Sequence, residues 1–242
     1  IDGNGKTLTS TATRAINVAT EGEVNISNLT VVGTDKTERA INVIEEAANL
    51  TLNNVKAEGF KYTINVAASS VGSEIKTNGG KFSGYAAVNI TGDNTTFTSN
   101  ETEFVGVNNV PAGSTNAFAA IVIGDYVSGN TTDDVVVTIN GGNVTSTSAN
   151  GNAQSIVQVT AAKDAQVTVK AALSLCNENV FYTDCINEVT AKFPADYADE
   201  LNAQGYATSA ADENGLVTVL GDAVAEIVET GVNYATLAEA VT

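Results

Sequence analysis

The chain has 242 residues, of which 43% are hydrophobic, so it can bury a substantial core as one large all-β domain or as two ordinary domains. It carries 11 Lys and Arg residues against 28 Asp and Glu residues, which gives a net charge of −17. Such an acidic surface repels phosphate backbones and anionic headgroups, and no apolar run approaches the roughly 20 residues of a membrane helix. We therefore expect no nucleic-acid partner and no membrane insertion.

A short motif recurs along the first two thirds of the chain. Its copies are Ile16-Asn17-Val18, Ile41-Asn42-Val43, Ile64-Asn65-Val66, Val88-Asn89-Ile90 and, more loosely, Ile121-Val122-Ile123 and Ile156-Val157-Gln158. A second series lies between these copies and includes Val24-Asn25-Ile26, Leu50-Thr51-Leu52, Ile75-Lys76-Thr77, Phe97-Thr98-Ser99, Val137-Thr138-Ile139 and Val167-Thr168-Val169. A third series follows each of them, as in "ISNLTVVG" and "LNNVKAEG".

Three short alternating segments in each period, with Gly and Asn between them, indicate a repeat of strands and turns. A period in the twenties is typical of a solenoid, in which each unit buries its apolar face only against its neighbours. Leucine-rich repeats have a similar period, but their Leu ladder and helical segment are missing from this sequence. We therefore predict an all-β solenoid of parallel coils over residues 1–172, with about six to seven coils.

The asparagines of the first motif are expected to form a ladder on the outside of the coils. Strand side chains alternate, so the flanking Ile and Val residues point inward while Asn17, Asn42, Asn65 and Asn89 point outward. Their spacing should be about 4.8 Å per coil, which allows side-chain hydrogen bonds from one coil to the next. The ladder could serve stability alone, or it could be a polar stripe for sugar hydroxyls.

The three series, together with "IDGNGKT" at residues 1–7, resemble the pectate-lyase-like right-handed parallel β-helix proteins. The resemblance covers residues 1–172 and brings no catalytic motif with it. Near the C-terminus, "GYATSAADENGLVTV" and "AEIVETGVNYATLAEAVT" are similar to segments that join β-helical units in large bacterial surface and adhesin-like proteins. The resemblance implies a right-handed β-helix at the cell surface, outside the cell, continuous with further repeat domains.

Residues 173–242 are predicted to form a small α+β cap, because the periodicity stops there and the end of a solenoid needs a lid. "PADYADELNAQGY" predicts a short helix, and the residues around Asn214-Gly215 predict a hairpin. Residues 223–228 predict a strand, and Thr236 with Glu239 predicts a capping box. The sequence has neither an initiator Met nor a signal peptide, so we expect a processed or excised segment of a longer protein.

Two cysteines, Cys176 and Cys185, enclose the short segment "NENVFYTD". In a chain rich in Asn, Thr and Gly, cysteines this close together predict a small disulfide loop in an oxidising, extracellular environment. Two reduced thiols are the alternative.

The absence of His excludes His-based triads, His-ligated zinc and a His general base. Arg14 and Arg39, the only arginines, hold the same position before the first motif, with Tyr62 next in the series. Stacked guanidinium groups could clamp sugar carboxylates, or they could form ordinary surface pairs with neighbouring glutamates such as Glu38. Asp133-Asp134 are adjacent on a predicted strand and should face opposite ways.

Insertions over residues 107–119 and 124–134 enlarge the fifth coil. The first lies on the edge shared with Arg14, Arg39 and the asparagine ladder, so it should overhang the polar face, and Tyr126 in the second offers a stacking surface. Surface loops without a ligand are the alternative. We therefore predict a non-catalytic module that serves as a stalk or binds a glycan or a host or cell-surface protein, without a cofactor. A lyase or hydrolase acting on acidic polysaccharides is the alternative. Calcium could nevertheless bind among the Asp-rich loops. Threonine-rich stretches also allow ice binding, but they do not keep one register from coil to coil.

Overall fold

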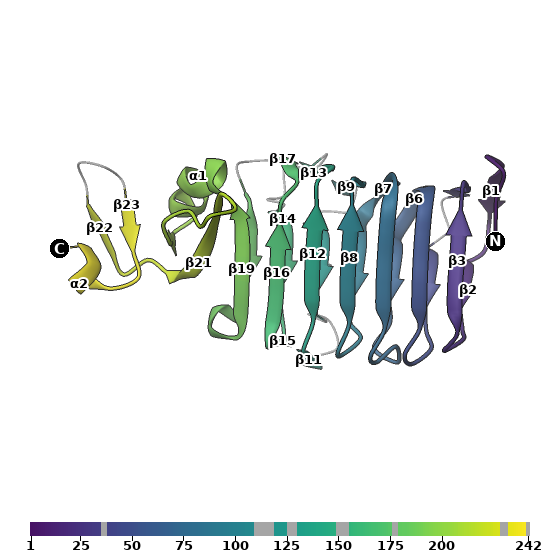
Figure 1. The fold of residues 1–242 in the computed structure, drawn as a ribbon, viewed down its shortest axis with the longest axis horizontal. Helices are drawn as coiled ribbons and strands as arrows, with labels where there is room; N and C mark the ends of the chain where they lie inside the picture. Colours follow the sequence, from purple (N-terminus) through teal and green to yellow (C-terminus); the bar gives the residue numbers. More distant parts are fainter. Residues whose placement is uncertain are drawn as a thin grey trace.

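A computed structural model describes residues 1–34, 38–108, 119–124, 130–148, 155–175, 179–227 and 232–240. The described chain consists mostly of β-strands, and most of them belong to one large, mainly parallel hydrogen-bonded sheet (Figure 1). The predicted all-β class is therefore confirmed. The strands lie side by side along the long axis of the molecule, with the two termini at opposite ends.

The strands form three parallel stacks, and the chain visits the stacks in the same order on every turn. The first stack contains β2 (Arg14–Val18), β5 (Arg39–Val43), the last parts of β6 (Asn49–Val66) and β7 (Glu74–Ile90), β10 (Ala119–Ile123), β14 (Ser155–Val159) and β18 (Phe181–Thr183). The second stack contains β3 (Glu23–Ser27), the first parts of β6 and β7, β8 (Thr96–Asn100), β12 (Val136–Asn140), β16 (Ala165–Val169) and β19 (Val189–Pro194).

The third stack contains β1 (Thr7–Ser10), β4 (Thr30–Gly33), the middle parts of β6 and β7, β9 (Glu103–Asn108), β13 (Asn143–Ser148) and β17 (Ala172–Ser174). Two short strands, β11 (Thr132–Asp133) and β15 (Ala162–Lys163), pair with each other at a corner between stacks. Parallel pairing extends past residue 172, because β18 and β19 continue the first and second stacks.

The register confirms the sequence repeat, with one correction. Ile16, Ile41, Ile64, Val88 and Ile121 occupy one column of the first stack, and all six predicted copies of the second series also align. The sixth copy of the first motif was predicted one residue too early. Ile121 pairs with Val157, so the aligned segment is Val157-Gln158-Val159 rather than Ile156-Val157-Gln158.

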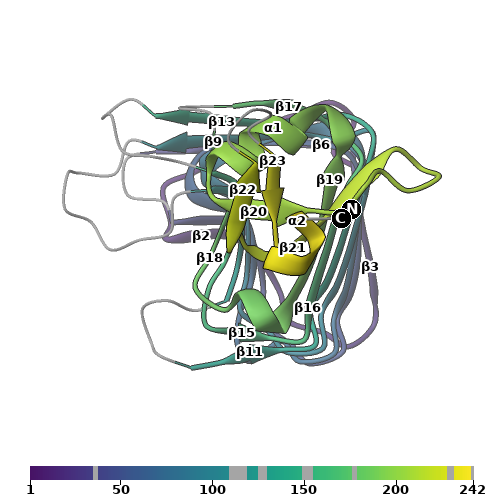
Figure 2. The same cartoon turned by 90° about the vertical axis from the view of Figure 1, so that its left-hand side faces the viewer.

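Viewed from the end, the three stacks lie on different sides of the molecule (Figure 2), and buried residues of all three form one apolar cluster. Ile41 from the first stack, Leu52 from the second and Val55 from the third are all fully buried in it. Phenylalanines also lie in this core, with the rings of Phe82 and Phe104 stacked at 5.9 Å between centroids. Buried side chains of successive turns therefore pack together in one apolar cluster.

Left-handed residues form the corners between the stacks. At the corner from the second stack to the third, Asn28, Asn54 and Glu101 have φ values near 50°, and Gly79 and Gly141 have φ values of 65° and 69°. This conformation costs most L-residues about 1–2 kcal/mol, whereas Asn and Gly adopt it readily. The Asn and Gly residues that divide the sequence segments are therefore the residues that turn the chain.

The predicted elements of the C-terminal segment are present. It contains the short helices η1 (Ile186–Glu188), η2 (Ala195–Tyr197), α1 (Ala198–Ala203) and α2 (Leu237–Ala240) and the strands β20 (Tyr206–Thr208), β21 (Leu216–Asp222), β22 (Ala225–Ile227) and β23 (Val232–Tyr234). β20 and β21 form the predicted hairpin around Asn214-Gly215. The capping box is also confirmed, because Thr236 and Glu239 exchange side-chain to backbone hydrogen bonds of 3.1 and 3.3 Å.

This segment closes the C-terminal end of all three stacks. β21 adds an antiparallel strand to β19 in the second stack. The Tyr197 hydroxyl takes the place of a further strand on β17, because it accepts a hydrogen bond from Leu173 N at 3.0 Å and donates one to Leu173 O at 2.9 Å. Gln204 does the same for β18, since its Oε1 accepts from Val180 N at 2.8 Å and its Nε2 donates to Phe181 O at 2.9 Å.

Replacing Gln204 with Ala should lower the free energy of unfolding by about 1–2 kcal/mol, because Val180 N and Phe181 O lose their hydrogen-bond partners. Urea unfolding measures the change. Gln166→Ala is the matched control, since Gln166 lies exposed on β16, and it should change stability by less than about 0.5 kcal/mol. Equal effects of the two substitutions would contradict the role given to Gln204.

Candidate functional site

The two arginines and Tyr62 lie in one column at the start of the first stack. Arg14 pairs with Arg39, and Arg39 pairs with Tyr62 on the next turn, as the sequence predicted. The Arg39 guanidinium contacts the Glu38 carboxylate at 3.0 Å, which is the surface pairing expected as the alternative to a sugar clamp. The Lys61 ammonium lies 5.3 Å from the centre of the Tyr62 ring, a cation–π distance.

The predicted asparagine ladder is present, and we call it the first-stack ladder. Asn42 donates to Asn17 Oδ1 at 2.9 Å, Asn65 donates to Asn42 Oδ1 at 2.8 Å, and Asn89 donates to Asn65 Oδ1 at 2.8 Å. The amides thus form a chain of side-chain hydrogen bonds along the axis of the stacks. Within the chain, each inner asparagine uses one donor and one acceptor on its neighbours.

The expectation that this ladder is an open polar stripe is wrong for its inner members. The exposed fractions of Asn42, Asn65 and Asn89 are 2%, 3% and 8%, and only Asn17 is exposed. The asparagines of this ladder do face away from the main core. Val122 pairs with Asn89 on the next turn, and it packs with Ala86 and Ala119 in a separate apolar cluster. The ladder therefore satisfies buried amides, and three of its four asparagines are not accessible to a sugar.

Other predicted residues lie partly or wholly outside the described chain. Tyr126 is outside it, as is most of the insertion at residues 107–119. The predicted disulfide is not confirmed: Cys185 has a free thiol, 3.4 Å from Thr183 Oγ1, and Cys176 lies outside the described residues.

A second amide ladder, not predicted from the sequence, lies where the second stack turns into the third. Asn78 donates to Asn53 Oδ1 at 2.8 Å, Asn100 donates to Asn78 Oδ1 at 2.9 Å, and Asn140 donates to Asn100 Oδ1 at 3.3 Å. We call it the corner ladder. Its signal was present in the sequence, because each member follows a second-series segment at the same offset.

Threonines of the second stack also keep a common register from turn to turn. Thr51, Thr98, Thr138 and Thr168 share one outward column, interrupted by Lys76 between the first two. Of these, only Thr98 belongs to the threonine-rich stretches of the sequence, and those stretches lie in different stacks, with Thr98 in the second and Thr145 in the third. A single interrupted column is nevertheless far from the regular two-dimensional array that an ice surface would require.

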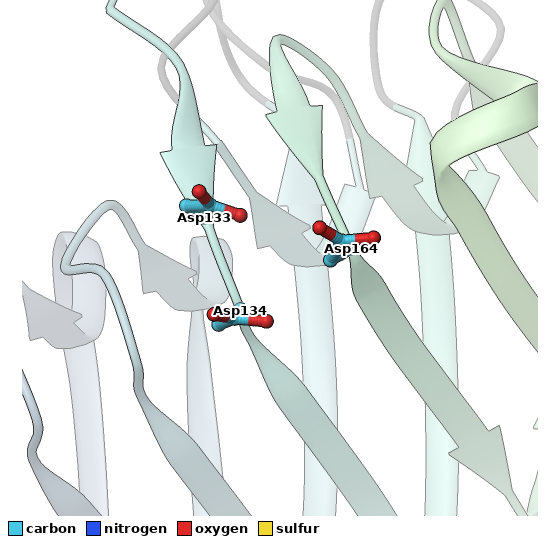
Figure 3. Close-up of side chains that lie close together, drawn as sticks. All are labelled: Asp133, Asp134 and Asp164. Atoms are coloured by element: carbon cyan, nitrogen blue, oxygen red, sulfur yellow. The ribbon is translucent and has the colours of Figure 1, made fainter.

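An acidic cluster lies at the corner before the second stack (Figure 3). Carboxylate oxygens of Asp133, Asp134 and Asp164 lie within 4.8 Å of one another. The two adjacent aspartates come together because Asp134 is left-handed, with a φ of 52°, so the alternation expected for a strand does not hold there. Asp134 and Asp164 lie three residues before Val137 and Val167, which pair with each other in the second stack. This equal spacing is the sequence signal for the proximity of the two aspartates.

A lysine already provides the positive charge in this cluster. Lys163 Nζ lies 3.2 Å from Asp164 Oδ2 and 3.5 Å from Asp133 Oδ2. The hydrogen bond to Asp164 and the charges of both aspartates raise the pKa of Lys163. The ammonium therefore opposes a second cation at this position.

Comparisons with protein-family models, curated proteins and solved structures found no match to this chain. Assignment of function therefore depends on the geometry. In the described part of the chain, no helix has the length and apolar composition needed to cross a membrane.

Proposed function

We propose that the chain is a right-handed parallel β-helix that acts as a rigid, non-catalytic module at the cell surface and binds glycans or other host or cell-surface molecules. The observation that carries this proposal is the set of three parallel stacks, tied along the long axis by backbone hydrogen bonds and by two amide ladders. A continuous hydrogen-bonded rod of this kind is suited to holding a binding surface away from its anchor.

The charged side chains support binding in preference to catalysis. Catalysis by a lyase or a hydrolase needs ionisable groups that converge on one substrate position. Several described charges instead pair with one another, as Arg39 does with Glu38, Lys81 with Glu103, and Lys163 with Asp133 and Asp164. The polysaccharide lyase or hydrolase therefore remains the second candidate.

A glycan array, run with and without calcium and including polyuronates, tests the proposal. We expect binding of at least one glycan class, followed by no release of unsaturated or shortened sugars when the bound glycan is incubated with the protein. Release of such products would favour the enzyme. Absence of binding to every glycan would contradict glycan binding and leave a structural stalk or a contact with other surface molecules.

A further inference from the structure

A pocket of about 430 Å³ lies near the N-terminal end, at the corner from the second stack to the third. Its lining spans three successive turns and consists of Asn4, Gly5, Asn28, Leu29, Thr30, Asn54 and Lys56. This volume is within the range of small-ligand sites in proteins. The wall combines three side-chain amides, a hydroxyl, a primary amine and one leucine.

The backbone around the pocket is fixed by a tight turn. Lys6 N donates to Gly3 O at 2.8 Å across Asn4 and Gly5, whose φ values of 50° and 70° fit a type I′ turn. Gly3 is required by close packing, because a Cβ there would lie 2.6 Å from Asn28 O. "IDGNGKT" is therefore a turn that closes one side of the pocket.

Hydrogen bonds also position two of the three amides. Asn54 donates to Asn28 Oδ1 at 3.1 Å, and Asn28 donates to Asp2 Oδ1 at 3.3 Å. Asn28 and Asn54 are both left-handed, which holds them at equivalent places on successive turns. In the described part of the chain, the Asn4 side chain forms no hydrogen bond, so its amide can donate to and accept from a ligand.

Lys56 is an uncompensated cation in this acidic chain. In the third stack, Lys56 pairs with Thr30 on one neighbouring turn and with Lys81 on the other. The Lys81 ammonium forms an ion pair with the Glu103 carboxylate at 2.7 Å. Within the described residues, no carboxylate forms an ion pair with Lys56, although the chain as a whole carries a net charge of −17. Among the described residues, the positive charge at the pocket therefore has no carboxylate partner.

We propose that this pocket binds the terminal acidic sugar of a glycan, with the Lys56 ammonium on the sugar carboxylate and the amides of Asn4 and Asn54 on its hydroxyl groups. Ammonium–carboxylate hydrogen bonds are stronger than neutral ones, and amides can both donate to and accept from hydroxyls. The pocket is partly open to solvent, so it can take the end of a glycan while the remaining sugars extend away from the protein. This inference rests on the proposed glycan-binding function and names its ligand class.

Isothermal titration of the full chain with sialyllactose, and with lactose as the neutral probe, tests the site. The wild-type protein should bind sialyllactose and not lactose, and added salt should weaken the binding. Lys56→Gln should lower the affinity at least about ten-fold, because a charge-assisted contact is lost. Asn54→Gly, which keeps the left-handed backbone, should lower it several-fold.

Lys76→Gln is the matched control, because Lys76 is an exposed lysine of β7 and its loss changes the net charge equally. It should leave the affinity unchanged, and thermal melting of each variant should confirm that the fold is retained. Any of three results would overturn the site. The wild-type protein does not bind sialyllactose, it binds lactose equally well, or Lys76→Gln lowers the affinity as much as Lys56→Gln does. A glycan that binds regardless of Lys56→Gln would overturn this site but support the proposed function. An array without any bound glycan would contradict both this site and the glycan-binding part of the proposed function.

Discussion

Replacing Gly80 with alanine should lower the free energy of unfolding by about 3 kcal/mol or more. Gly80 has a φ of 89°, a conformation that costs an L-residue at least about 1–2 kcal/mol. An added Cβ would also overlap the Val55 carbonyl oxygen and lie 2.8 Å from Val55 N on the neighbouring turn. The backbones of β6 and β7 would have to separate there. Each hydrogen bond lost between them lowers the free energy of unfolding by about a further 1 kcal/mol.

Gly79 provides the control for this prediction in the preceding residue. Its φ is 65°, but a Cβ at Gly79 would have no heavy atom within 4 Å. Gly79→Ala should therefore cost only the conformational term of about 1–2 kcal/mol. Urea unfolding of both variants separates the two effects. If Gly80→Ala were no more destabilising than Gly79→Ala, the backbones of the two turns could not be as close at Gly80 as described.

Replacing Asn65 with alanine should lower the free energy of unfolding by about 2–4 kcal/mol. Asn65 lies in the middle of the first-stack ladder, where its exposed fraction is 3%. The change leaves Asn42 Oδ1 without its donor and Asn89 Nδ2 without its acceptor, both in buried positions. Each buried polar group left without a partner costs about 1–3 kcal/mol.

Asn17→Ala tests whether burial is the cause. Asn17 is the exposed end of the same ladder and accepts a hydrogen bond from Asn42 at 2.9 Å. Water can replace an exposed partner, so this change should cost less than about 1 kcal/mol. Denaturant titration of the two variants gives the comparison. A loss as large at Asn17 as at Asn65 would show that burial does not govern the ladder.

The repeat was predictable because its register depends on residues that the fold requires. Inward side chains must be apolar on every turn, and left-handed corners favour Asn and Gly, so both leave periodic marks in the sequence. Those marks placed Asn17 with Asn42 and Arg14 with Arg39. The corner ladder left a mark of the same kind, and Asn53, Asn78, Asn100 and Asn140 could have been aligned by the same procedure.

Other features could not be predicted from the pattern. Alternation shows on which side of a strand a residue lies, but not whether another segment covers that side, so the burial of Asn42, Asn65 and Asn89 was missed. The sixth copy was shifted because Ile156, Val157 and Val159 are all buried, so apolar character alone does not fix the register there. The pocket joins residues from three turns, and Lys56 carries no sequence signal that distinguishes it from other exposed lysines.

The direction of the hydrogen bonds between turns has a mechanical consequence. Both the backbone bonds of the stacks and the amide ladders run along the long axis, at right angles to the strands (Figure 1). Tension applied between the two ends therefore breaks the hydrogen bonds between turns sequentially, one turn after another, and not all at once. Asn65 and Asn89 are 24 residues apart, so each released turn would lengthen the chain by about 80 Å at roughly 3.4 Å per residue. Such a rod resists bending, yet under a pull it yields in steps and absorbs work at each of them.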